Sequence, residues 1–190
     1  MIDFIIAGLG NPGLAYTHTR HNLGFTVLDA FLRETDPLTQ WLPNKKHQSL
    51  SALLSYSGKK LLCVKPQAYM NLSGVVLQSV CSYYKVAPTQ LIVIYDDAQL
   101  AFSTVKISLH KGAGGHKGIQ NILERVGTGF IAFRVGIGGK PIAQMSMADY
   151  VLSPFTAEEN TLLGLQLKKI LQTLNLLIDK GPIIAMNTNS

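Results

Sequence analysis

Apolar residues along this chain fall either into short unbroken runs or into helical spacing. The run Leu91-Ile-Val-Ile-Tyr95 is typical of a parallel strand that is buried on both faces. Phe4 to Ala7 is a similar run that ends in a glycine-rich turn, whereas Phe25, Leu28 and Phe31 recur on one face of a helix. The strands predicted in this way cover residues 4–7, 51–56, 61–64, 91–95, 104–109 and 133–137, and the helices cover residues 22–34, 119–126 and 157–179, with a further helix after residue 73.

Capping signals place the ends of these helices. Asn22 is the expected N-cap of the first helix, and Ser73 or Asn71 can cap the next. Thr156-Ala-Glu-Glu159 is a capping box that opens the long helix 157–179, and Lys180-Gly181-Pro182 ends it. We expect an irregular, flexible tail over residues 182–190.

The composition narrows the class of protein. The 190 residues suit one domain over 1–190, and 47% hydrophobic against 15% charged residues excludes a disordered chain. The net charge of +6 suits a polyanionic partner such as RNA, although plain surface charge gives the same surplus. Cys63 and Cys81 lie in apolar surroundings and are expected to be reduced and buried. Without a signal sequence or membrane span, a cytoplasmic location is expected.

His21 is the strongest candidate for chemistry. It lies between the glycine-rich turn and the first helix, just beyond the carboxyl end of a strand, where open α/β sheets bind ligands. A histidine exchanges protons near neutral pH, so it can serve there as a base, or it can simply hydrogen-bond within its own loop. Asp96 and Asp97 end the strand 91–95 and point to opposite sides. One of them can hydrogen-bond a histidine, and a surface turn is the alternative.

The sequence motifs argue against several other kinds of site. Gly8-x-Gly10-x-x-Gly13 matches a dinucleotide fingerprint, but Pro12 interrupts it and the helix starts about ten residues too late to face a pyrophosphate. There is no nucleophile elbow, reactive thiol context or P-loop. No His-Glu-x-x-His motif is present, so we expect no metal site. The loop from His110 to Gly118 can cradle a phosphate or a carbonyl oxygen.

Taken together, six ordered motifs resemble those of the bacterial-type peptidyl-tRNA hydrolases. They are Gly8-Leu-Gly-Asn-Pro-Gly13, Tyr16-x-x-Thr-Arg-His-Asn-x-Gly24, Tyr69-Met-Asn-Leu-Ser-Gly74, the strand ending at Asp96, Gly114-Gly-His-x-Gly118 and Arg134-x-Gly-Ile-Gly138. The resemblance implies a single α/β domain with a mixed, mostly parallel central sheet flanked by helices. It also implies hydrolysis of the ester between a peptide and the 3′-terminal ribose of tRNA, which recycles peptidyl-tRNA.

The resemblance assigns roles to individual residues. His21 would be the general base and Asp96 its orienting partner. Asn11 and Asn71 would hold the peptide main chain, and Met70 would shape that pocket. By the same likeness Tyr16 and Lys117 are placed in the substrate site, and Arg134 would grip the tRNA. The implied enzyme needs no metal or cofactor, binds the acceptor stem and CCA end of peptidyl-tRNA, does not bind membranes and is expected to be a monomer.

Two positions depart from the family pattern. Lys117 stands where the family usually has Asn, and Ser108 occupies a place that often holds a phosphate-binding Lys. The phosphate contact would then move to Lys106, Lys111 or Lys117. The competing interpretations are a relative that binds RNA without cutting it and, more distantly, a nucleotide-dependent oxidoreductase.

Overall fold

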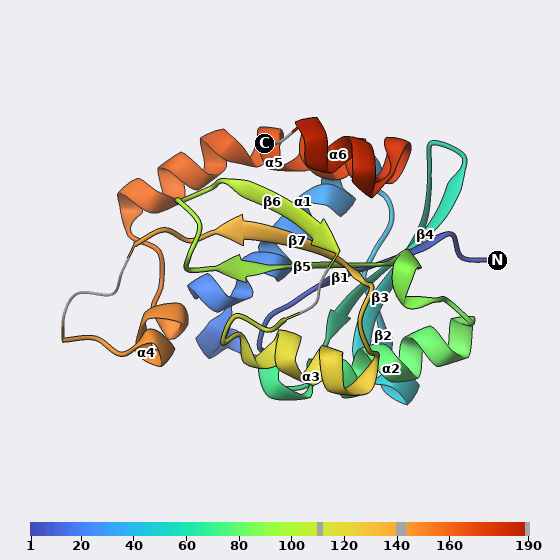
Figure 1. Cartoon of the computed structure of the whole chain (residues 1–190), viewed down its shortest axis with the longest axis horizontal. Helices are drawn as coiled ribbons and strands as arrows, with labels where there is room; N and C mark the ends of the chain where they lie inside the picture. Colours follow the sequence, from blue (N-terminus) through green and yellow to red (C-terminus); the bar gives the residue numbers. More distant parts are fainter. Residues whose placement is uncertain (110–111, 140–143, 189–190) are drawn as a thin grey trace.

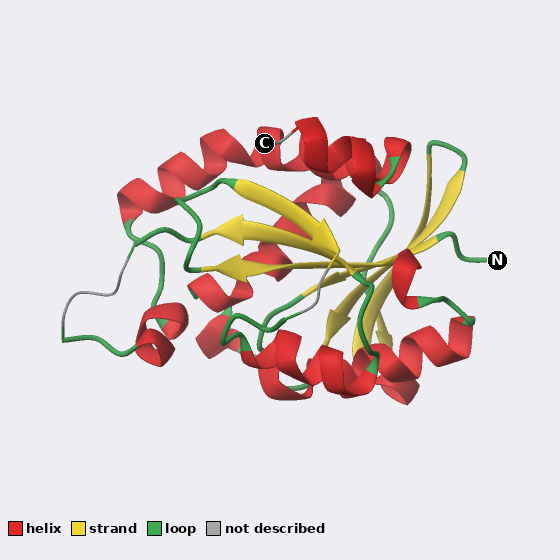
Figure 2. Ribbon diagram, viewed as in Figure 1, coloured by secondary structure: helices red, strands yellow, loops and turns green. Residues whose placement is uncertain are grey.

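The computed structural model describes residues 1–109, 112–139 and 144–188. A central sheet lies between helices that cover both of its faces (Figures 1 and 2). The strands are β1 (Phe4–Gly8), β2 (Leu42–Asn44), β3 (Ser49–Tyr56), β4 (Lys59–Pro66), β5 (Leu91–Asp97), β6 (Val105–Leu109) and β7 (Ile131–Gly136). The α-helices are α1 (Leu23–Thr35), α2 (Ser73–Tyr84), α3 (Lys117–Arg125), α4 (Met147–Leu152), α5 (Ala157–Lys180) and α6 (Pro182–Thr188). The short 3₁₀ helices are η1 (Leu14–Tyr16), η2 (Arg20–Asn22), η3 (Lys45–His47), η4 (Met70–Leu72) and η5 (Pro88–Gln90).

The sheet has the order β2-β3-β4-β1-β5-β7-β6. Its central strands β4, β1, β5 and β7 run parallel, whereas β2 and β3 on one side and β6 on the other pair in antiparallel fashion. The expected mixed sheet is therefore confirmed, with the parallel part at its centre. The carboxyl ends of β1, β5 and β7 meet at one edge, which is where ligands bind in such folds.

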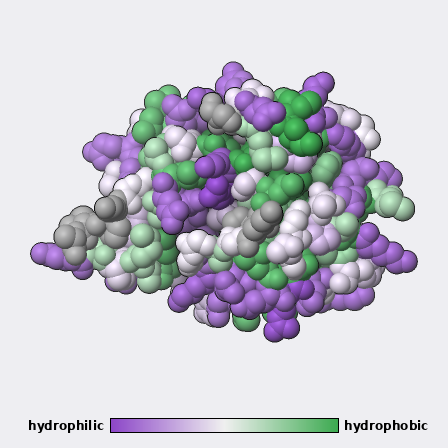
Figure 3. All heavy atoms as spheres, in the orientation of Figure 1, coloured by the Kyte–Doolittle hydropathy of each residue, from purple (hydrophilic) through white to green (hydrophobic). Residues whose placement is uncertain are grey.

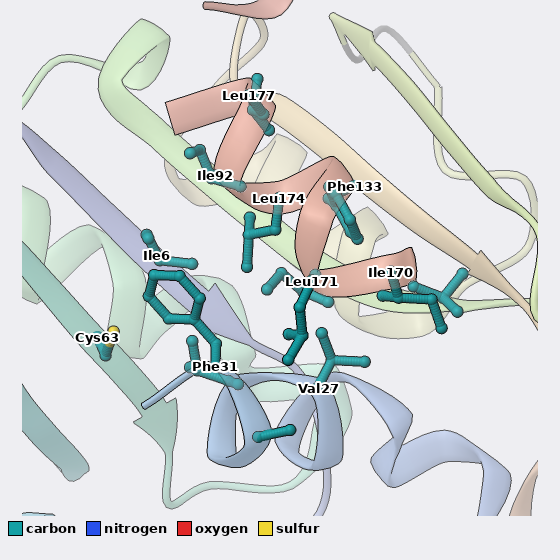
Figure 4. Packing of buried hydrophobic residues seen from close by; sticks show 14 of the residues in the cluster. Ile6, Val27, Phe31, Cys63, Ile92, Phe133, Ile170, Leu171, Leu174 and Leu177 are labelled. Atoms are coloured by element: carbon teal, nitrogen blue, oxygen red, sulfur yellow. The ribbon is translucent and has the colours of Figure 1, made fainter. Parts of the chain in front are cut away.

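Two hydrophobic cores fill the space between the sheet and its helices. Alternate residues of the central strands point to opposite faces, so Ile6 and Ile92 face α1 and α5, whereas Ile5 faces α2 and α3. Figure 4 shows the first core, in which side chains of α1 and α5 meet over the sheet. Helices on both faces explain why β5 reads as a continuous apolar run, since its residues are buried up to Asp96.

A close contact between two glycines brings the His21 segment to the sheet. A Cβ on Gly24, at the start of α1, would lie 2.4 Å from the carbonyl oxygen of Ile94, and one on Gly8 would lie 2.4 Å from the oxygen of Gly24. Larger residues would push α1 away from β1 and β5. The loop after Gly8 leads into η1 and η2 instead of a helix on Gly13, as expected for a sequence that does not bind a dinucleotide.

The predicted irregular tail is wrong for residues 182–188. Gly181 takes a positive φ of 83° and ends α5, and Pro182 then begins α6 in the first helical position, which proline favours. Ala185 is fully buried, and α6 contacts both α5 and β6. The predicted capping box of α5 is confirmed, with Thr156 and Glu159 each accepting from the backbone N–H of the other.

Candidate active site

His21 and Asp96 form a buried pair at the carboxyl edge of the sheet. His21 belongs to η2, directly before α1, and Asp96 is the last fully buried residue of β5. Nδ1 of His21 lies 2.9 Å from Oδ1 and 3.0 Å from Oδ2 of Asp96. The two side chains thus come together as the sequence predicted, since η2 follows β1 and β1 is the neighbour of β5 in the sheet.

Asp96 also contacts a residue that the sequence did not single out. Nε2 of His116 lies 3.2 Å from Oδ1 of Asp96, and the rings of His116 and His21 lie 4.8 Å apart at their centroids. Burial raises the pKa of the Asp96 carboxyl, but the charges and hydrogen bonds of His21 and His116 outweigh burial and hold it well below its usual range. Asp96 therefore stays ionised between the two imidazoles.

In the sequence, His116 stands out only because it belongs to the motif Gly114-Gly-His-x-Gly118 and comes directly before a predicted helix. It is the N-cap of α3, and its Nδ1 accepts a hydrogen bond from the backbone N–H of Ile119 at 3.3 Å. Since Nδ1 accepts, the proton of the neutral ring is on Nε2, which donates it to Asp96.

The same logic fixes the tautomer of His21. The ionised carboxylate of Asp96 can only accept, so Nδ1 of His21 carries the proton that it donates. In the neutral ring this leaves the lone pair on Nε2, and His21 lines the cavity described below. A nitrogen in this state can take a proton from a water molecule.

Within the described residues, His21, Asp96 and His116 also place three possible metal-ligating atoms within 4.8 Å of one another. A metal on Nε2 of His116 would move the ring proton to Nδ1, where the N–H of Ile119 already points. The same three groups are already joined by the hydrogen bonds of His21 and His116 to Asp96. The absence of a metal cofactor stays a prediction.

Asn11 is held in place by Asn22. The backbone N–H of Asn11 donates to Oδ1 of Asn22, and Nδ2 of Asn22 donates to the carbonyl of Asn11. Asn22 occupies the N-cap position of α1 as predicted, but its side chain makes no capping hydrogen bond because it is used in this longer-range contact. Oδ1 of Asn11 accepts from the backbone N–H of Met70 at 2.7 Å, so its Nδ2 is the end left to bind a ligand.

Met70 and Asn71 lie in η4, beside Asn11. Met70 is buried, Asn71 is exposed, and both line the cavity. Neither Ser73 nor Asn71 caps α2 with its side chain, contrary to our prediction. Instead Oδ1 of Asn121, on α3, accepts from the N–H groups of Gly74 and Val75 at the start of α2. This long-range contact could not be seen in the local sequence.

A cavity of about 640 Å³ opens over the His21–Asp96 pair. It is bounded by the sheet edge, by the segment 112–117 and by α4, which contributes Met147, Val151 and Leu152 to its wall. A volume of this size suits a ligand of several residues. Figure 3 shows hydrophilic residues on this face near the carboxyl ends of β5 and β7 and the start of β6.

Arg20 connects η2, which contains His21, to the segment that follows α4. Its guanidinium donates to the carbonyl of Pro154 and the hydroxyl of Ser153, pairs with Glu159 at 2.5 Å and lies over the Tyr150 ring. Because Arg20 directly precedes His21, these contacts connect the His21 segment to the segment after α4.

The predicted tRNA-binding cations divide into two groups. Arg134 lines the cavity and pairs with Asp97 at 3.2 Å, and Lys106 lies opposite Arg134 in the β6–β7 register, on the same face of the sheet. Lys117 is exposed, begins α3 and lines the cavity. Lys111 lies outside the described residues. Tyr16 does not line the cavity. Its ring packs edge-on against the ring of Tyr69, and Tyr69 is part of the cavity wall.

Fold and site together define a single-domain α/β protein of the enzyme class, with a histidine–carboxylate pair inside a ligand-sized cavity. A family model described as peptidyl-tRNA hydrolase matches residues 5–190. The peptidyl-tRNA hydrolase of Lachnoclostridium phytofermentans is 39% identical over 185 residues, which cover 97% of this chain and 95% of that protein. The peptidyl-tRNA hydrolase of Bacillus subtilis is 44% identical over 159 residues, which cover 82% of this chain and 81% of that protein. The crystal structure of peptidyl-tRNA hydrolase from Acinetobacter baumannii matches with a TM-score of 0.90 at 26% identity, covering 100% of this chain and 97% of that one.

This chain belongs to the peptidyl-tRNA hydrolase family and, like these relatives, is a hydrolase. The resemblance found in the sequence motifs is thus confirmed. Among the described residues, no helix is both long and apolar enough to cross a membrane.

Proposed function

We propose that the protein hydrolyses the ester between a peptide, or an N-blocked aminoacyl group, and the 3′-terminal ribose of tRNA. Water is activated by His21, which Asp96 orients. The observation that carries this proposal is the buried hydrogen bond between Nδ1 of His21 and Asp96, which leaves Nε2 as a base at the cavity.

The reaction needs no group beyond the chain, the substrate and water. Nε2 of His21 takes a proton from water while the oxygen bonds to the ester carbonyl carbon. The tetrahedral intermediate then breaks its bond to the ribose 3′ oxygen, which receives the proton from His21. Asp96 stabilises the imidazolium between these steps. The products are a peptide with a free carboxyl group and a tRNA with a free 3′ hydroxyl.

The amides beside the base suit a substrate whose side chains vary. Asn11 and Asn71 are uncharged and can bind the main chain of any peptide, and donors of this kind also stabilise a developing oxyanion. Met70 shapes the same part of the cavity with a flexible apolar side chain. Asn11 is held by contacts to Asn22 and Met70, so its free Nδ2 group is preorganised.

Positive charge is placed where the RNA would lie. Lys106 and Arg134 lie side by side on one face of the sheet, and Lys117 is exposed at the cavity rim. We assign the acceptor stem and CCA end of tRNA to these cations, with Lys111 as a further contact. Tyr16 supports the rim through Tyr69. The net charge of +6 favours such a partner.

In the cell this activity would free tRNA from peptides that leave the ribosome early, and we place it in the cytoplasm, with the protein acting as a monomer. The test is to incubate the protein with N-acetylaminoacyl-tRNA and EDTA and to measure released, deacylated tRNA. Hydrolysis by the wild type and not by His21→Ala supports the proposal. Binding of the tRNA without cleavage by the wild type would identify an RNA-binding relative instead.

A further inference from the structure

Asp97 is the second carboxylate at the end of β5, and it lines the same cavity as His21. Asp96 takes part in the proposed reaction, whereas Asp97 has so far only its ion pair with Arg134. Alternate residues of a strand share a face, so Asp97 lies on the face of Tyr95, whose register partner on β7 is Arg134. The side chain of Asp97 is only 12% exposed. A carboxylate covered to this extent needs hydrogen-bond donors in place of the water that it has lost.

Two donors fix the position of the Asp97 carboxylate. Oδ1 accepts from the backbone N–H of Gln99 at 2.8 Å, and Oδ2 accepts from Nη1 of Arg134 at 3.2 Å. A carboxylate oxygen can accept two hydrogen bonds, so both oxygens keep an acceptor site for a ligand in the cavity. Because Gln99 and Arg134 hold it from both ends, the carboxylate is oriented before a ligand arrives.

The place of Asp97 in the sheet indicates which part of the substrate it meets. The strands β1, β5, β7 and β6 are neighbours in this order (Figure 1). His21 follows β1 and Asp97 ends β5, whereas Arg134 and Lys106 lie opposite each other on β7 and β6. The proposed function puts the ester at His21 and the RNA phosphates at the two cations. Asp97 therefore lies between the ester and the phosphates, where the terminal ribose joins them.

A ribose hydroxyl suits this carboxylate better than the neighbouring groups of the substrate. The negative charge of Asp97 repels a phosphate, and a carboxylate cannot donate to the carbonyl oxygen of the ester. A hydroxyl group can donate to a carboxylate, and acidic side chains bind the 2′ hydroxyl of ribose in this way in dinucleotide-binding folds. When the peptide is esterified to the 3′ oxygen, the 2′ hydroxyl is free to donate.

We propose that Asp97 accepts a hydrogen bond from the 2′ hydroxyl of the terminal ribose of tRNA. The inference rests on the proposed function and adds to it a specificity for ribose beside the scissile ester. The contact holds the neighbouring 3′ oxygen in a fixed place near His21. It also selects the 3′ ester, because a peptide on the 2′ oxygen leaves no 2′ hydroxyl to donate.

The test compares N-acetylalanyl-tRNA that ends in adenosine with the same tRNA that ends in 2′-deoxyadenosine. The ribose discrimination is the ratio of the two kcat/KM values divided by the ratio of the two spontaneous hydrolysis rates, which removes the intrinsic effect of the hydroxyl. In the wild type it should be about tenfold or more, because a hydrogen bond to a charged group contributes about a factor of 10 to 100. In Asp97→Ala it should fall to about one, and Asp97→Asn, which keeps the shape without the charge, should lose most of it.

Two further variants separate this contact from the ion pair and from a general loss of negative charge. Arg134→Ala should weaken tRNA binding but keep most of the ribose discrimination, since the N–H of Gln99 still orients Asp97. Asp179→Ala, which removes an exposed carboxylate on α5, should match the wild type. Thermal melting of each variant checks that it is folded.

A ribose discrimination of about one in the wild type would overturn the contact. A discrimination that survives both Asp97→Ala and Asp97→Asn would also overturn it. An equal loss in Arg134→Ala and Asp97→Ala would do the same, because the discrimination would then depend on the ion pair and not on Asp97 itself. If the wild type cleaves neither substrate, the proposed function fails instead.

Discussion

The rings of His21 and His116 lie 4.8 Å apart, and both donate a hydrogen bond to Oδ1 of Asp96. A single ionised carboxylate therefore sets the proton positions of two histidines. His21 is left with its acceptor nitrogen at the cavity, whereas His116 uses both ring nitrogens within the protein. We therefore propose that His116 is a positioning residue, which acts on the proposed base His21 through Asp96.

Removal of His116 should accordingly lower turnover more than binding. His116→Ala takes one donor from Asp96 and the cap from α3, and kcat should fall about 10-fold or more while KM changes little. His116→Asn, which can still cap the helix, should recover stability without recovering kcat in full. His18→Ala, on an exposed histidine, is the matched control and should behave as the wild type. A KM effect alone would contradict the positioning role.

The ionised state of Asp96 predicts a pH dependence of stability. Its pKa in the folded protein lies well below the ordinary value of 3.8, so the carboxylate stabilises the fold fully above that value, and the contribution is lost as pH falls toward the folded pKa. Asp96→Asn should lower the free energy of unfolding by roughly 1–3 kcal/mol at pH 6–7. Urea unfolding at pH 7 and pH 3 checks this, since the difference from wild type should shrink at pH 3. A difference that grows at pH 3 would refute the assignment.

The two ends of the Asn11 amide have different expected roles: Oδ1 holds Met70 and Nδ2 binds the substrate. Two substitutions distinguish these roles. Asn11→Asp keeps the oxygen that accepts from the N–H of Met70 but removes the Nδ2 donor, whereas Asn11→Ala removes both. Both variants should lose turnover on peptidyl and N-acetylaminoacyl esters alike, by about 10- to 100-fold. Only Asn11→Ala should also lower the melting temperature. A loss confined to one amino acid would mean that Asn11 selects side chains.

Substitution of Lys117 tests what the lysine does at a position where the family usually has Asn. Its side chain is exposed at the cavity rim, which favours contact with a tRNA phosphate over a place beside His21. Lys117→Asn should keep substantial hydrolysis at low salt, weaken tRNA binding and reduce the slope of log affinity against log salt by about 1. The salt dependence of tRNA binding and the pH profile of kcat/KM measure this. An unchanged slope with a shifted acidic limb would show that Lys117 acts on His21 instead.

The sequence predicted the parts of this fold and site that depend on neighbouring residues. Asp96 could be placed because it ends an unbroken apolar strand, and His21 because it follows the turn of the adjacent strand. His116 was missed since its contact with Asp96 depends on how the segment 112–116 crosses the sheet edge. Asn121, which caps α2 from another helix, was missed for the same reason. In both cases the partner is distant in sequence, and local patterns carry no information about it.

Single-turnover hydrolysis of N-acetylaminoacyl-tRNA by His21→Ala, measured beside equilibrium binding of the same tRNA, tests the role of His21 most directly. If Nε2 of His21 activates the water, the rate should fall by at least about 10²-fold while the dissociation constant stays within about a factor of two of wild type. Asp96→Asn should cost as much or less, because it disturbs the tautomer of a base that is still present. Hydrolysis at nearly the wild-type rate in His21→Ala would show that another group activates the water.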